Sequence, residues 1–154
     1  MKKLFFVALG FLALGLSAAA PARAQGSVRE PDTVAMRDTV LEKDMQGNLI
    51  KAYHYFKLKK AYRASLSRAE EIIAGYPNFS RLDEALYIAG MSNLYMSEKK
   101  GHQPPLLPVE KHREEARVYL SRLVNEYPQS KLRDEAEKEL QAIGGVAPKT
   151  QDKQ

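Results

Sequence analysis

The chain has 154 residues, with 24 Lys and Arg against 19 Asp and Glu, a formal charge of +5 and no cysteine. Three of the basic residues lie in the predicted leader, so the remainder carries 21 basic and 19 acidic residues. These charges are interspersed, which excludes the single-sign field typical of nucleic-acid binding. The missing cysteine excludes a disulfide framework. It also predicts a protein without a lipid anchor, because a lipoprotein carries its acyl chains on a cysteine directly after its leader.

The start of the chain has the three-part layout of a secretory signal peptide. Two lysines precede an apolar run over 4–20, and Ala22 and Ala24 supply the small side chains of a cleavage site. The alternatives are an earlier cut within 18–20 or an uncleaved membrane anchor, but the apolar run is at the short end of the spanning range and contains two glycines. We therefore predict that residues 1–24 are a cleaved signal peptide and that the chain is exported.

Residues 25–47 form a lead-in that we expect to be partly helical or flexible. Its first part is polar and contains Gly26 and Pro31, and a weak helical pattern follows over 33–46. Gly47 then punctuates that pattern.

Two amphipathic helices are predicted next, over 49–58 and 62–76, with a short turn near Lys59 and Lys60 between them. In the first helix, apolar residues recur at i, i+3, i+4 and i+7. Pro77 ends the second helix, because proline disfavours helix in the residue before it and lacks the amide needed to continue.

A third helix is predicted over 82–96, with Asn78 or Ser80 as its cap. Gly90 lies in its middle, where glycine costs about 1 kcal/mol relative to alanine. We therefore expect a neighbouring element to approach closely at Gly90.

A proline-rich loop is predicted over 98–108, because three prolines within five residues exclude helix. It carries Leu106 and Leu107 on a stiff backbone. Two interpretations stay open: a plain connector whose leucines fold back onto the domain, and a docking loop that presents them to a partner.

Two more helices are predicted after the loop. The first begins at Val109 or Glu110 and is ended by Pro128, and the second is capped by Ser130 and runs to Ile143. Glycines close the second helix, and we expect 144–154 to be a disordered tail.

The helices contain an internal repeat. Shifting the chain by 51 positions superposes 69–85 on 120–136 without a gap, so that Tyr76-Pro77 matches Tyr127-Pro128. A fixed-period match of this kind is typical of helical repeats, in which one helix pair must stack on the next to bury its apolar face. The sequence thus predicts an all-α fold over 48–143, with tetratricopeptide-like antiparallel hairpins in a short right-handed α-solenoid of about five to six helices.

The sequence contains no recognisable catalytic or metal-binding motif. Its three histidines, His54, His102 and His112, have no metal-ligand spacing, and we expect His112 to be solvated in a charged helix start. Adjacent carboxylates diverge on a helix, so they are interpreted as helix starts and solvated faces. We predict a protein that is not an enzyme and has no cofactor, metal or catalytic residue.

With these elements in place, the chain resembles the periplasmic tetratricopeptide proteins of the BamD (YfiO-like) outer-membrane assembly lipoproteins and the Tol-Pal coordinators (YbgF/CpoB-like). The resemblance lies in small and apolar residues at fixed distances before Pro128, and in a glycine thirteen residues after Pro77. Ser65, Asn93 and the proline-rich insertion depart from the usual pattern. The resemblance implies a non-enzymatic periplasmic protein, peripheral to the outer membrane.

Two functions are predicted. The first is a scaffold that binds an envelope protein, with outer-membrane assembly as the process that the resemblance implies. The alternative is a structural or cell-wall-associated protein that forms homo-oligomers, as the Tol-Pal coordinators suggest. Tyrosine combines a large contact area with a polar tip, so tyrosines and the two loop leucines are the candidate protein-binding residues. These candidates are Tyr53, Tyr62, Tyr87, Tyr95, Leu106 and Leu107.

Overall fold

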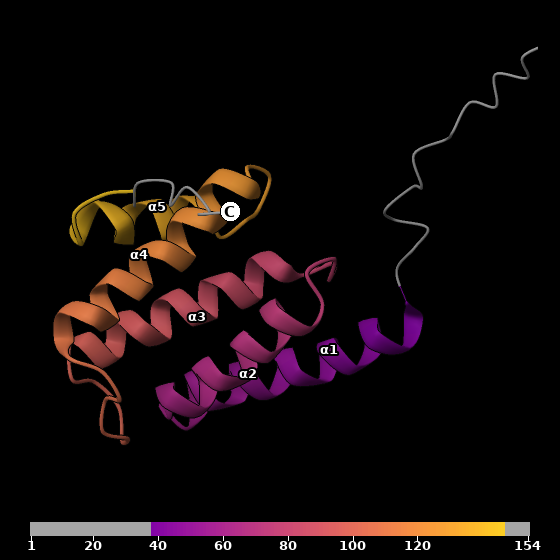
Figure 1. Ribbon diagram of the computed structural model, residues 1–154, viewed down its shortest axis with the longest axis horizontal. Coiled ribbons are helices and arrows are strands. Elements are labelled where there is room, and N and C mark those ends of the chain that lie inside the picture. Colours follow the sequence, from indigo (N-terminus) through magenta and orange to yellow (C-terminus); the bar gives the residue numbers. More distant parts are fainter. Residues whose placement is uncertain (1–37, 147–154) are drawn as a thin grey trace, which may run out of the picture. The chain divides into compact units, whose positions relative to one another are not determined.

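The structure is a computed structural model that describes residues 38–146, and every regular element in that range is helical (Figure 1). The predicted signal peptide, residues 25–37 of the lead-in and residues 147–154 of the tail lie outside the described residues. The all-α prediction is confirmed. The elements are α1 (Thr39–Tyr53), the π-helical turn η1 (His54–Leu58), α2 (Tyr62–Gly75), α3 (Leu82–Ser97), α4 (Val109–Glu126) and α5 (Arg133–Ala142).

Each helix packs on the next one in the chain, and α3 lies between α2 and α4 (Figure 1). The α2–α3 and α4–α5 pairs are the two hairpins that the repeat predicts, and α1 packs mainly on α2. This stacking of adjacent helices is the tetratricopeptide-like arrangement expected from the sequence.

The two Tyr-Pro turns have the same backbone hydrogen bonds. Phe79 N donates to Tyr76 O and Ser130 N donates to Tyr127 O, both at 3.0 Å. The turns differ in how they lead into the next helix. The residue that precedes α3 is Arg81, whose side chain makes no capping hydrogen bond. Ser130 Oγ accepts from Leu132 N at 3.2 Å, immediately before α5.

α3 is buried on all sides, which makes it the centre of the described fold. Between Ala85 and Ser97 it carries small, apolar and uncharged polar residues only. One apolar cluster joins it to α1 and α2, and a second joins it to α4 and α5. A helix that is apolar all round is stable only when neighbours cover each face.

α1 does not break at Gly47, where the sequence analysis placed its punctuation. The helix starts at a cap in which Asp38 Oδ1 accepts from Val40 N at 2.8 Å, and it continues to Tyr53. Leu49 and Ala52 are fully buried and hold it against its neighbours. Tertiary burial therefore outweighs the modest cost of one glycine in a helix. The π-helical turn that follows α1 was not predicted.

The close approach expected at Gly90 is present. A Cβ atom at that position would lie 2.6 Å from Leu120 Cγ of α4. Leu120 is itself fully buried, so it has little space into which to move. Gly90 thus allows α3 and α4 to pack at contact distance.

We predict that Gly90→Ala lowers the free energy of unfolding by about 1–2 kcal/mol, because overpacking against Leu120 outweighs the gain in helix propensity. The matched control is Gly47→Ala, also in a helix interior, where nothing lies within 4 Å of the new Cβ. It should raise the free energy of unfolding by about 0.5–1 kcal/mol. Urea denaturation followed by circular dichroism measures both, and equal effects of the same sign would contradict the account.

Candidate functional site

The start of the proline-rich loop is fixed to the start of α2. Gly101 has φ +91° and lies so close to Lys60 that a Cβ would be 2.6 Å from the Lys60 carbonyl oxygen. His102 N donates to the same oxygen at 3.2 Å. Gln103 Oε1 accepts from Ala64 N at 3.1 Å, so it satisfies one of the amides left open at the start of α2.

The end of the loop is fixed by His112, and the expectation that this side chain is solvated is wrong. His112 is 1% exposed. Its Nε2 accepts from Leu107 N at 3.1 Å, and its Nδ1 lies 2.7 Å from Asn93 Oδ1 on α3. Asn93 Nδ2 in turn donates to Ala89 O at 3.1 Å. Because Nε2 must accept from the Leu107 amide, the ring is neutral and donates from Nδ1.

Between these two attachments the loop presents its leucines to solvent. Leu106 is 62% exposed and Leu107 is 44% exposed. Exposed leucines on a flexible connector would be unremarkable. Here, however, the side chain of Gln103 before the pair and the backbone amide of Leu107 itself are held by partly buried hydrogen bonds. The leucines therefore occupy a defined position beside α2.

A groove with a volume of about 430 Å³ runs between the loop and α2. Its lining combines apolar side chains with charges of both signs. The lining residues are Tyr55, Arg63, Ala64, Leu66, Ser67, Arg68, Glu70, Gln103 and Leu106.

One edge of the groove is connected to α4. Tyr119 Oη donates to Glu70 Oε1 at 3.0 Å, across 49 residues of chain. Partial burial raises the pKa of the Glu70 carboxyl, the bond from Tyr119 lowers it, and the nearby Glu115 raises it, with a net rise. This contact links α2 to α4 beside the groove.

Two of the predicted tyrosine anchors lie in an aromatic cluster. Tyr62, Tyr95 and Phe56 have ring centroids 5.0–5.5 Å apart, with the rings of Phe56 and Tyr95 stacked. Tyr62 is buried in this cluster, whereas Tyr95 is half-buried and has Lys100 Nζ 4.8 Å above its ring centroid. The structure thus brings these two residues together in internal packing near the loop.

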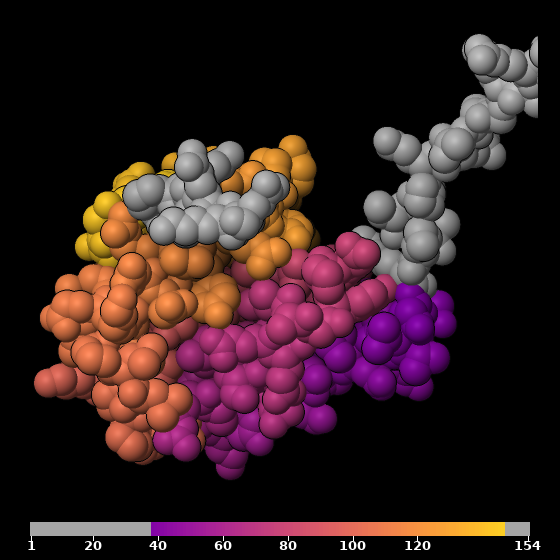
Figure 2. Space-filling model, viewed as in Figure 1, coloured from indigo at the N-terminus to yellow at the C-terminus, as the bar shows by residue number. Residues whose placement is uncertain are grey.

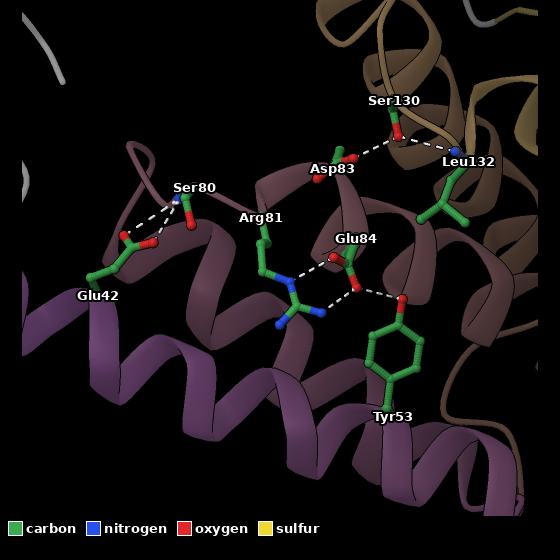
Figure 3. Close-up of polar contacts among 8 residues, drawn as sticks. All are labelled: Glu42, Tyr53, Ser80, Arg81, Asp83, Glu84, Ser130 and Leu132. Atoms are coloured by element: carbon green, nitrogen blue, oxygen red, sulfur yellow. Dashed lines mark hydrogen bonds and ion pairs between the residues drawn. The ribbon is translucent and has the colours of Figure 1, made fainter.

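The other two tyrosines are each directed at a glutamate of a later helix. Tyr53 Oη donates to Glu84 Oε2 at 2.8 Å, and Arg81 binds the same carboxylate through two nitrogens (Figure 3). Burial, followed by the hydrogen bond to Glu84, raises the pKa of Tyr53. Burial and a hydrogen bond with Glu135 likewise raise the pKa of Tyr87. Both tyrosines serve contacts between helices, and their predicted role as partner anchors stays a prediction.

A second polar link joins the two Tyr-Pro turns. Ser130 Oγ donates to Asp83 Oδ2 at 2.6 Å and accepts from Leu132 N (Figure 3). At the far side of the first turn, Ser80 N donates to the carboxylate of Glu42 at 3.3 Å (Figure 3). The helix starts are therefore tied to one another, away from the loop and its groove.

Sequence reasoning singled out the two leucines, without deciding whether they are exposed, and missed the residues that position them. Asn93 and His112 are polar residues on faces that the helical pattern marks as buried, and that pairing is the signal that indicates a buried hydrogen bond. Gln103 and Tyr119 have no such signal, because their partners are 39 and 49 residues away. Within residues 38–146, no group of three metal-ligating side chains converges.

We predict that stability falls as the pH drops below about 7, because burial lowers the pKa of His112 from 6.5. The unfolded chain then binds a proton that the native chain does not, so this contribution is complete well above the unfolded pKa of 6.5 and is lost as the pH falls through the lower native pKa. Thermal melts between about pH 7.5 and pH 5.5 measure the effect, and the window avoids most carboxylate titration.

The matched variants for this test are His112→Gln and His102→Gln. His112→Gln should flatten the pH dependence while lowering stability throughout, by about 1–3 kcal/mol, because a buried hydrogen bond is perturbed. His102 is exposed, so His102→Gln should keep the original pH dependence. A slope that persists in His112→Gln would assign the pH dependence to other groups.

Comparison with known proteins gives a family match. A family model described as YfiO, outer membrane lipoprotein, matches residues 38–146, the same range that the structure describes. No curated protein matches the chain, and neither does any solved structure. Within the described range, no helix has the length and apolarity needed to cross a membrane.

This match corrects the prediction that the protein has no lipid anchor. That prediction was drawn from the cysteine count alone. The family is one of outer membrane lipoproteins, which are held by lipid on an N-terminal cysteine, so the prediction is wrong at the level of the family.

The same match confirms two other predictions. The resemblance to BamD-like proteins is the one that the family model finds, and the periplasmic location at the outer membrane agrees with the family's description. The family model covers more than half of the chain, which shows the family. The chain belongs to the YfiO family of outer membrane lipoproteins.

Proposed function

We propose that this protein is a non-enzymatic scaffold that binds an envelope protein through the groove between α2 and the proline-rich loop. One observation carries the proposal: Leu106 is 62% exposed on the wall of that groove, while the loop is held at both ends. Membership in a family of outer-membrane lipoproteins supports a role in outer-membrane assembly, which we include in the proposal.

The fixed loop favours binding over a simple connection. A segment that already has its bound conformation loses little conformational entropy when a partner arrives. Gly101 in a left-handed conformation, Gln103 on α2 and His112 on Leu107 each restrict the loop. A connector between two helices needs no such restriction, since long surface loops are tolerated at small cost.

The groove lining suggests the chemistry of the partner. Leu106 and the ring of Tyr55 offer apolar surface, while Arg63 and Glu70 offer charges of opposite sign. A groove of about 430 Å³ is suited to a few side chains, not to a whole domain face. We therefore propose that the partner supplies an extended segment with an apolar side chain between polar ones.

Self-assembly is the alternative function predicted from the sequence. Sedimentation of the chain at several concentrations separates it from the scaffold function. A monomer at all concentrations favours the scaffold, and a concentration-dependent rise in mass favours a homo-oligomer.

The scaffold proposal predicts site-specific crosslinking in cells. A photoreactive residue at Ser67, in the groove, should capture one envelope protein, and the same residue at Lys138, on α5, should not. Leu106→Asp should reduce the Ser67 capture by about tenfold or more, because a charge replaces the apolar contact. Val118→Asp is the matched control, since Val118 is an exposed apolar residue of α4 that does not line the groove.

The same variants test the role in assembly. Leu106→Asp should lower the level of outer-membrane barrel proteins when it replaces the original chain, and Val118→Asp should leave that level unchanged. Equal capture by both variants, or capture from Lys138 as strong as from Ser67, would contradict a partner site in the groove.

A further inference from the structure

Basic residues gather at one end of the helices. This end, here called the basic tip, consists of residues 54–60 and 98–113, which include η1, the turn into α2, the proline-rich loop and the first residues of α4. The hydrogen bond from His102 N to Lys60 O joins the two segments. Figures 1 and 2 show the loop beside the junction of α1 and α2, at the lower left of each view.

The charge of the tip is positive. Residues 54–60 contain three lysines and no acidic residue, and residues 98–113 contain four basic and two acidic residues. Two of the lysines form ion pairs, Lys100 with Glu98 and Lys111 with Glu114. Among the described residues no ion pair engages the other basic side chains of the tip, which are all exposed. These side chains are Lys57, Lys59, Lys60, Lys99 and Arg113.

The opposite end of the helices carries acidic residues at three helix starts, with Arg81 and Arg133 paired to Glu84 and Asp134. Acidic pairs open α3 and α5, and α1 begins with Asp38 and has Glu42 in its first turn. The interspersed charge of the sequence as a whole therefore conceals a separation along the helix axes. A nearly neutral protein can in this way present one attractive end to an anionic surface.

Exposed leucines lie among the lysines. Leu58 at the end of η1 is 74% exposed, and Leu107 of the loop is 44% exposed. Neither lines the groove beside α2. The hydrogen bond from Leu107 N to His112 holds the second leucine in place. Apolar side chains surrounded by long cationic ones are typical of surfaces that bind membranes. The leucines enter the interfacial layer, and the lysines lie among the headgroups.

We infer that the basic tip contacts an anionic lipid surface, as an attachment of the protein to the outer membrane in addition to any anchor outside the described residues. The protein's location supplies the surface. Lysine-rich segments next to a membrane are attracted to anionic lipids, and stable attachment takes two signals, such as an acyl chain with a basic patch.

The composition favours lipid over an acidic protein as the occupant. Six of the seven basic residues of the tip are lysines. Lysine is depleted in protein interfaces, where arginine and aromatic residues are enriched. Lysine acts as a mobile point charge, which suits headgroups with no fixed geometry.

Vesicle binding tests the inference. The chain, exported and processed by cells, is mixed with vesicles of phosphatidylethanolamine and phosphatidylglycerol, and binding is measured by co-sedimentation. Lys57→Glu, Lys59→Glu and Arg113→Glu combined should weaken binding by about a hundredfold or more, because three attractive charges become repulsive. Any other attachment is shared by all variants, so their differences report on the tip.

The matched control reverses three exposed lysines away from the tip, by Lys43→Glu, Lys131→Glu and Lys138→Glu. It changes the net charge by the same amount and should retain most of the binding. Circular dichroism establishes that each variant is folded. If the control weakens binding as much as the tip variant does, overall charge and not the tip is responsible, and the inference is wrong.

The leucines are tested separately. Leu58→Ser with Leu107→Ser should weaken binding by about tenfold, because less apolar surface enters the membrane. The control is Ile50→Ser with Val118→Ser, two exposed apolar residues outside the tip, and it should bind like the original chain. The inference is wrong if the chain binds uncharged phosphatidylcholine vesicles equally well. It is also wrong if the tip variants keep their vesicle binding but lose a crosslink to an acidic protein.

Discussion

The contact between Gly90 and Leu120 is the constraint on which the described fold depends. Because Gly90 has no side chain, Leu120 of α4 lies where a Cβ atom at this position of α3 would clash, so the two helices pack closely. α3 is buried on all sides, so it must be covered by α2 on one face and by α4 on another. The position of α4 then sets the position of the proline-rich loop, because the loop is hydrogen-bonded to His112 at the start of α4.

The loop is both a long connection between helices and a surface with a fixed backbone. The connection between α3 and α4 is long, and by itself such a connection would cost little and move freely. A surface that presents Leu106 and Leu107 needs a fixed backbone. Hydrogen bonds to the helices hold that backbone. The backbone amide of Ala64 at the start of α2 donates to Gln103 of the loop, and the buried side chain of Asn93 on α3 binds His112. The same bonds that complete the helix starts and the core also position the exposed leucines.

Most of the fold could be predicted from the sequence, because the evidence for it is local. The period of apolar residues places the helices, prolines end them, and Gly90 indicates a close neighbour. The polar positions of the site could not be predicted in the same way. His112 has charged neighbours in sequence that suggest solvent, although the helical pattern marks its face as buried, and its partner Asn93 lies on another helix. Gln103 lines the groove and Tyr119 binds Glu70 at its edge, and the partners of both are distant in the chain. α1 continues through Gly47 because burial of Leu49 holds the helix against its neighbours.

The tyrosine and glutamate contacts give the array a direction. α3 has both halves of the contact: Glu84 receives Tyr53, and three residues later Tyr87 reaches Glu135 of α5. α5 repeats the glutamate, but three residues later it has Lys138 in place of a tyrosine. If a further hairpin were duplicated onto this end, the glutamate at its start would have no tyrosine hydroxyl to bind. Extending this series of contacts to a further hairpin by duplication would first require an aromatic residue at position 138.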